Sequence, residues 1–80
     1  MVKEGDILIF KRNLSEWKEG DICECISSIK SNNIFLFLIK NLRSGKESSW
    51  CSDYEGPLYI YNWFYDLSEW RDRQIDILND

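Results

Sequence analysis

GPLYIYNWFY, residues 56–65, holds five of the chain's twelve aromatic residues, and we expect the fold to be organised around it. Residues 58–65 alternate as a β-strand would, since successive side chains on a strand point to opposite faces. One face would carry Leu58, Ile60, Asn62 and Phe64, and the other Tyr59, Tyr61, Trp63 and Tyr65. Neither face is polar apart from Asn62, so the rest of the chain or a partner must cover both. The pattern places Leu58, Ile60 and Phe64 in the core.

Length and composition favour one small domain, residues 1–80. A chain of this size buries only about 60% of the surface that its unfolded form exposes, so we expect modest stability. The 44% hydrophobic and 30% charged residues are typical of a globular protein. The longest apolar run, residues 34–39, is far shorter than the ~20 residues of a membrane span. With no apolar signal region in MVKEGD, we expect a cytoplasmic protein with no membrane partner.

The three cysteines are Cys23, Cys25 and Cys51, and the chain has no histidine. Cys23 and Cys25 lie two apart on an expected strand and are poorly placed to form a disulfide with each other. Three thiolates without a fourth ligand make a poor zinc site. We therefore expect reduced cysteines that act as small apolar residues, with no metal and no cofactor.

The net charge of −4 is unevenly distributed. Residues 53–80 hold seven acids against two arginines, whereas residues 29–52 hold four bases against Glu47 alone. Nucleic-acid-binding proteins usually show a basic balance. The acidic balance disfavours a nucleic-acid partner and favours a partner protein with a basic surface.

Short strands separated by turn residues predict a mainly β fold. The expected strands are residues 6–11, 21–28, 34–40, 47–51 and 58–65. In the second strand we expect Cys23 and Cys25 to face inward with Ser27, or a β-bulge to intervene. The third strand is apolar on both faces and predicts a position covered on both sides. Gly20 and Gly45 mark turns, and Asn13 predicts a capped helical turn over residues 14–19.

Residues 66–78 leave two alternatives open. Asp66 and Glu69 fit a capping box, and the apolar residues that follow fall near one helical face. Residues 74–77, however, also alternate as a strand would. We favour a helical turn over residues 67–71 followed by a short strand over residues 74–78, with a continuous C-terminal helix as the alternative. The segment 66–72 resembles 13–19, which a shared capped turn carrying a buried tryptophan would explain.

The layout resembles an SH3-like small β-barrel. The resemblance rests on Gly5-Asp6-Ile7, a long first connection, Gly20-Asp21-Ile22, the hairpin at residues 41–46 and a short helical turn near the end. It implies a five- to six-stranded antiparallel barrel. The chain has neither the ALYDY-like opening nor the adjacent tryptophan pair of peptide-binding SH3 domains, so no residue roles are carried over.

A non-enzymatic protein-binding module is the function that the sequence favours. Tyrosine and tryptophan dominate interface hot spots, although an 80-residue domain also needs aromatic residues for its core. The candidate partner-binding residues form an aromatic, acid-rimmed face: Trp50, Tyr54, Tyr59, Tyr61, Trp63, Tyr65, Asp53 and Glu55. A small acidic inhibitor or adaptor suits this pattern, and the Ile-, Asn-, Lys- and Ser-rich vocabulary hints at a phage or a low-GC bacterium. The sequence contains no histidine and no nucleophile–base motif, which disfavours an enzyme.

Two other hypotheses stay open. A nucleic-acid-binding barrel would use Lys30, Lys40, Arg43 and Lys46 with Trp50, although the pattern favours a solvated hairpin tip for these bases. Gly45-Lys46 lacks the earlier glycine and the following Ser or Thr of a P-loop. A homodimer would bury the extra apolar faces of residues 34–39 and 58–65 against a second copy.

Overall fold

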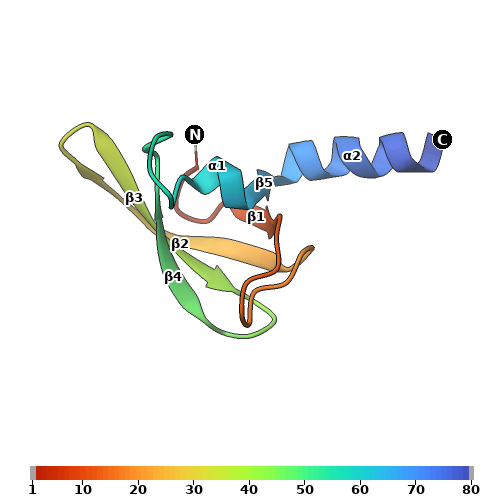
Figure 1. Ribbon diagram of the computed structural model, residues 1–80, viewed down its shortest axis with the longest axis horizontal. Coiled ribbons are helices and arrows are strands. Elements are labelled where there is room, and N and C mark those ends of the chain that lie inside the picture. The colour runs from red at the N-terminus through yellow and green to blue at the C-terminus, as the bar shows by residue number, and fades with distance from the viewer. Residues whose placement is uncertain (1, 80) are drawn as a thin grey trace.

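One antiparallel sheet of five strands forms the body of the protein, and a helix extends from its edge (Figure 1). The computed structural model describes residues 2–79, and the side chains of residues 2–74. The strands are β1 (Ile7–Phe10), β2 (Ile22–Ser31), β3 (Ile34–Asn41), β4 (Glu47–Cys51) and β5 (Phe64–Asp66). The helices are α1 (Ile60–Trp63) and α2 (Leu67–Asn79). The prediction of a mainly β, antiparallel fold is therefore confirmed.

The sheet is open and does not close into a barrel. Its strand order is β4-β3-β2-β1-β5, and over residues 2–79 the edge strands β4 and β5 do not pair with each other. The chain between them reaches β4 only through one isolated bridge, Cys51 to Tyr59, and then turns into α1. Since a helical turn presents no strand edge, this connection cannot complete the hydrogen-bond ladder. The expected SH3-like closed barrel is thus corrected to a curled, open sheet.

The largest departure from prediction is at residues 58–65, which do not form one strand. Tyr59 precedes the four-residue helix α1, and β5 begins only at Phe64. Ile60 and Phe64 are both fully buried, as predicted, whereas Leu58 is 46% exposed in the preceding turn. A spacing of four places two side chains on the same side of a helix and also on the same face of a strand. The apolar pattern therefore could not distinguish the two structures.

The core lies on one face of the sheet, beneath the loop that follows β1. It consists of Val2, Leu8, Phe10, Trp17, Cys23, Cys25, Phe37, Ile39, Trp50, Ile60 and Phe64. Cys23 and Cys25 face inward as predicted, and a β-bulge follows between Cys25 and Ser27. Because of the bulge, Ser27 pairs with Leu38 on the outer face and does not point inward. The prediction of an inward Ser27 was wrong, and its bulge alternative was right.

Strand β3 is covered on one face only. Phe37 and Ile39 are buried, while Leu36 on the opposite face is 45% exposed. Ile29, the partner of Leu36 on β2, is exposed as well. The predicted covering of both faces was therefore wrong at this place, where Leu36 and Ile29 leave the outer face of β3 and β2 exposed.

The two similar segments fold differently. Residues 14–17 form a tight turn in which Leu14 and Trp17 exchange backbone hydrogen bonds of 2.7 and 2.8 Å, and Ser15 has φ +54°. The predicted helical turn is absent there, because Gly20, with φ +89°, donates to the Phe10 carbonyl and returns the chain into β2. Trp17 is nevertheless buried as expected.

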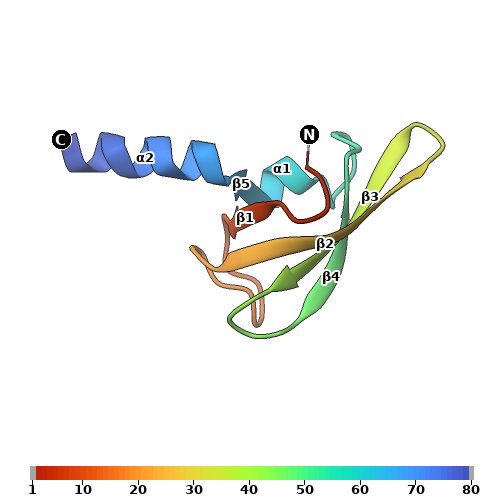
Figure 2. The same ribbon diagram turned by 180° about the vertical axis from the view of Figure 1, so that it is seen from behind.

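The second segment does begin a helix. The Glu69 amide donates to Asp66 Oδ1 at 2.6 Å, the predicted cap, and α2 then continues to Asn79. The favoured short strand over residues 74–78 was wrong and the continuous helix was right, because this segment meets no strand with which to pair. Figures 1 and 2 show α2 pointing away from the sheet, which gives the molecule its extents of 44 × 25 × 23 Å.

Candidate functional site

The predicted aromatic face is divided among four places, since α1 rotates residues 60–63 out of a strand arrangement. Trp50 and Trp63 belong to one cluster of rings with Phe10 and Phe64. Trp50 is 3% exposed, and its ring lies 5.1 Å from that of Phe64 and 5.2 Å from that of Trp63. Trp63 lies at the margin of the cluster, where its Nε1 donates to the Pro57 carbonyl at 2.9 Å. Trp50 therefore serves the core and presents no surface to a partner.

Tyr65 lies on the outer face of the sheet, opposite Ile9 of β1. Two cations lie over its ring, with Lys11 Nζ at 4.7 Å and the Arg73 guanidinium at 4.8 Å from the centroid. Trp70 of α2 packs against the same ring at 5.7 Å. These contacts fix the root of α2 to the sheet and give the surroundings of Tyr65 a basic character.

Tyr54 lies in the connection after β4 and is 73% exposed. Asp53 Oδ1 accepts a hydrogen bond from the Glu55 amide at 3.1 Å, so these acids shape a turn that presents Tyr54. Glu55 is exposed and Asp53 is half-buried. Tyr54, Asp53 and Glu55 thus form the one part of the predicted face in which an aromatic residue and its acidic neighbours remain together at the surface.

Tyr59 and Tyr61 form a separate pair at the start of α1. Their rings lie 5.6 Å apart at an interplanar angle of 72°, a favourable edge-to-face arrangement. Both side chains are half-buried. Burial raises the pKa of the Tyr61 hydroxyl, and the carboxylates of Asp66 and Asp6 act in the same direction. We refer to Tyr59 and Tyr61 below as the tyrosine pair.

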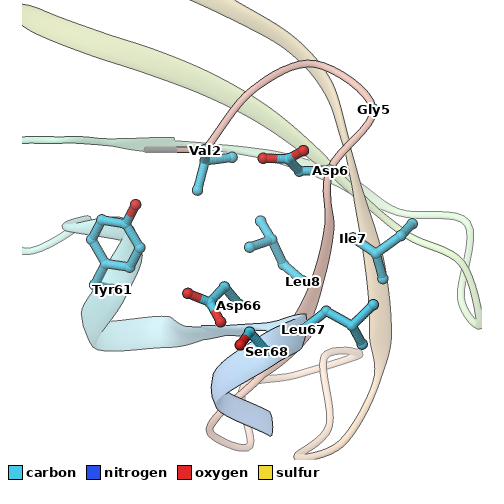
Figure 3. Close-up of a pocket in the computed structure, with 9 residues that line it drawn as sticks. All are labelled: Val2, Gly5, Asp6, Ile7, Leu8, Tyr61, Asp66, Leu67 and Ser68. Carbon is cyan, nitrogen blue, oxygen red and sulfur yellow. The ribbon is translucent and has the colours of Figure 1, made fainter. Parts of the chain in front are cut away.

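A cavity of about 380 Å³ opens beside Tyr61 (Figure 3). It is lined by Val2, Gly5, Asp6, Ile7, Leu8, Tyr61, Asp66, Leu67 and Ser68. The antiparallel pairing of β1 with β5 sets Leu8 opposite Asp66 and so brings the residues before β1 close to the start of α2. Sequence reasoning identified Asp66 only as a helix cap and missed Asp6 as a site residue, because nothing local connects positions 60 residues apart.

The basic residues of the alternative site do not form one surface. Arg43 is engaged by Asp21, with Nε to Oδ1 at 2.8 Å, and Lys46 Nζ lies 3.6 Å from Glu16 Oε2. Lys40 stands opposite Glu24 and Glu47 in the sheet register. Lys30 lies near the far end of the β2–β3 ribbon, with Nζ 6.0 Å from the Phe35 ring centroid. This placement leaves no shared phosphate-binding geometry for the four bases.

Asp21 is the most constrained acid of the described chain. Its carboxylate accepts hydrogen bonds from Arg43, from Asn41 Nδ2 at 2.8 Å and from the Lys18 amide at 2.9 Å. The hydrogen bonds from Arg43 are the main cause that holds its pKa well below the usual range, against the opposing effect of burial. Both oxygens of the Asp21 carboxylate are thus engaged by groups within the chain.

The cysteines are free, and Cys23 and Cys25 are fully buried. Burial raises the pKa of Cys23 to about 12 and raises that of Cys25 as well, which suppresses the reactive thiolate. Among the residues that the structure describes, no three His, Cys, Asp or Glu side chains gather as metal ligands would. Over the same described chain, no helix combines the length and apolar character needed to cross a membrane.

Comparison of the chain with protein-family models, with curated proteins and with solved structures gives no match. The geometry of the sites described above is therefore the basis for any functional conclusion.

Proposed function

We propose that this protein is a non-enzymatic binding module that engages a basic partner protein through the tyrosine pair and the acidic groups around it. The observation that carries the proposal is the pairing of Tyr59 with Tyr61, two half-buried rings in edge-to-face contact at the surface of α1. Such rings offer a large contact area with few rotatable bonds and a polar tip, the properties that make tyrosine frequent in hot spots.

The acidic surroundings support a basic partner. Asp6 and Asp66 line the cavity at Tyr61, and Asp53 and Glu55 flank the exposed Tyr54 in the connection that leads to α1. With a net charge of −4, the chain as a whole attracts positively charged surfaces and accelerates encounter with them. Such a surface would suit an adaptor, or a small phage or bacterial inhibitor that covers the surface of another macromolecule. Neither role requires more than binding through this surface.

The test is capture of a partner by the immobilised protein and by two variants. Tyr59→Ala/Tyr61→Ala removes both rings, and the matched control Leu14→Ala/Leu42→Ala removes two exposed apolar side chains from distant turns. We expect the wild type and the control to retain the same protein and the tyrosine variant to lose it. Equal retention by all three, with unchanged circular dichroism spectra, would contradict the proposed surface.

A further inference from the structure

The cavity beside the tyrosine pair has two chemically different parts. Its apolar lining comes from Val2, Ile7, Leu8 and Leu67, and its polar lining from two carboxylates, the Tyr61 hydroxyl and Ser68. Figure 3 shows the Asp6 and Asp66 carboxylates apart from each other, with the Leu8 side chain between them and the Tyr61 ring to one side. A volume of about 380 Å³ lies in the range of small-ligand pockets and accommodates one long side chain.

Both carboxylates are held in place by the backbone. Asp6 Oδ2 accepts from the Lys3 amide at 2.9 Å, and Asp66 Oδ1 accepts from the Glu69 amide at 2.6 Å. Each contact uses one oxygen of its carboxylate. The second oxygen of each group accepts no hydrogen bond from residues 2–74, so two acceptors remain at the cavity in fixed positions.

No cation of the described side chains neutralises these acids. The ion pairs formed within residues 2–74 are Arg43 with Asp21 and Lys46 with Glu16, and both lie in the turns at the other end of the sheet. The basic side chains closest in sequence to Asp66, Arg71 and Arg73, do not line the cavity, and Arg73 lies over Tyr65. The cavity thus presents two carboxylates that form no ion pair with a side chain of residues 2–74, and their negative charge favours the approach of a cation.

We infer that this cavity receives an arginine side chain of the partner protein, with the guanidinium between Asp6 and Asp66 and the aliphatic stem on Leu8. Arginine matches every part of the lining. Its methylene groups suit the apolar floor, its five donors can serve two separate carboxylates, and its planar head can stack on Tyr61. A lysine ammonium has three donors and no plane with which to stack, so it binds the same site more weakly.

This inference rests on the proposed function, and it specifies the residue that the partner contributes. It is tested by nuclear magnetic resonance titration of the ¹⁵N-labelled full chain with Nα-acetyl-arginine amide. The neutral control probe is Nα-acetyl-citrulline amide, which keeps the shape and loses the charge. We expect saturable shifts at the amides of Gly5, Leu8, Tyr61 and Ser68 with the arginine probe, smaller effects with the lysine analogue, and none with citrulline.

Asp6→Asn/Asp66→Asn is the decisive variant. Asparagine keeps the acceptor oxygen that serves the Lys3 and Glu69 amides, since it caps helices as well as aspartate does, and it removes only the charge. The matched control Glu19→Gln/Glu47→Gln removes the same charge from exposed positions elsewhere. We expect the asparagine variant to weaken arginine binding by about tenfold or more and the control to bind normally. If the double variant fails to fold, Asp6→Asn alone serves the same purpose.

Three results would overturn the inference: equal binding of citrulline and arginine, unchanged binding by the folded asparagine variant, or no saturable shifts at the cavity. Failure here is distinguishable from failure of the proposed function. If the arginine probe does not bind but Tyr59→Ala/Tyr61→Ala still abolishes partner capture, the proposed function is supported and the cavity does not receive arginine. If the probe binds the cavity but the tyrosine and asparagine variants capture the partner as well as the wild type does, the arginine site exists and the proposed binding surface is wrong.

Discussion

The guanidinium of Arg43 donates two hydrogen bonds to the carboxylate of Asp21, from Nε to Oδ1 at 2.8 Å and from Nη2 to Oδ2 at 2.9 Å. The same Nη2 donates to the Glu16 carbonyl. Asp21 precedes β2, Arg43 lies in the turn between β3 and β4, and Glu16 lies in the loop after β1. The contact therefore links the β3–β4 turn to the connection between β1 and β2, and we expect it to stabilise that end of the molecule.

Asp21→Asn should lower the free energy of unfolding by about 1–3 kcal/mol. The amide would turn a donor toward Arg43 and Asn41, so the buried Asn41 amide and the partly exposed Arg43 guanidinium would lose an acceptor. Urea unfolding followed by tryptophan fluorescence measures the change. Glu19→Gln, an exposed acid two residues earlier, should stay within about 0.5 kcal/mol of the wild type. Equal effects of the two substitutions on the free energy of unfolding would show that the hydrogen bonds of Asp21 do not contribute to stability.

Acid should destabilise the wild type more than the Asp21→Asn variant. The pKa of Asp21 is lower in the folded chain than its ordinary value of 3.8, so the unfolded chain binds more protons over the interval between the two values. The contribution of Asp21 is complete above its ordinary value and declines as the pH falls below it toward the folded pKa. Urea midpoints measured from pH 6 down to about pH 2 should converge for the two proteins. If the difference between the two urea midpoints stayed the same at every pH, Asp21 would not be the cause of the acid sensitivity.

One thiol should react in the native protein and three after unfolding. Cys51 is partly exposed, whereas Cys23 and Cys25 are buried and their raised pKa values keep the thiols protonated. Iodoacetamide labelling followed by mass spectrometry should therefore give a single fast adduct, located at Cys51. The Cys51→Ser variant should show none on the same timescale. Fast labelling of Cys23 in the folded protein would contradict the packing described above.

Phe64→Ala should cost about 3–5 kcal/mol of stability. The ring is fully buried and contacts Phe10, Trp17 and Trp50 at centroid distances of 5.1–6.2 Å. Tyr54→Ala, at a ring that is largely exposed, should change stability by about 0.5 kcal/mol or less. Chemical denaturation of both variants measures the difference. A small loss for Phe64→Ala would mean that the core can collapse into the vacated space.

Local patterns predicted the first four strands because their signals are short-range. Alternation placed Cys23 and Cys25 inward and anticipated the bulge, and Gly45, with φ +77°, occupies the turn that its residue type indicated. Trp50 lies on the predicted fourth strand, although in the core rather than on a binding face. In each case one residue's conformational preference or one face's polarity was sufficient.

The features that the sequence did not predict depend on contacts between residues that are distant in sequence. Whether residues 58–65 formed a strand or a helical turn depended on which edge the chain met, and the shared spacing of Ile60 and Phe64 carried no information about it. The two Leu-Ser-Glu-Trp segments adopted different structures for the same reason, since one returns to a strand and the other does not. The cavity could not be predicted from the sequence, because Asp6 and Asp66 come to line it together only through the pairing of β1 with β5.

The close packing of three indole rings in the aromatic cluster has a spectroscopic consequence. Trp50 and Trp63 lie 5.2 Å apart at an interplanar angle of 46°, and Trp17 lies 6.0 Å from Trp50. Transition dipoles at such separations and tilts couple, so their circular dichroism depends on the mutual orientation of the rings and vanishes when tertiary packing is lost. The chain thereby carries its own optical reporter of native structure, by which every variant named above can be examined without an added label.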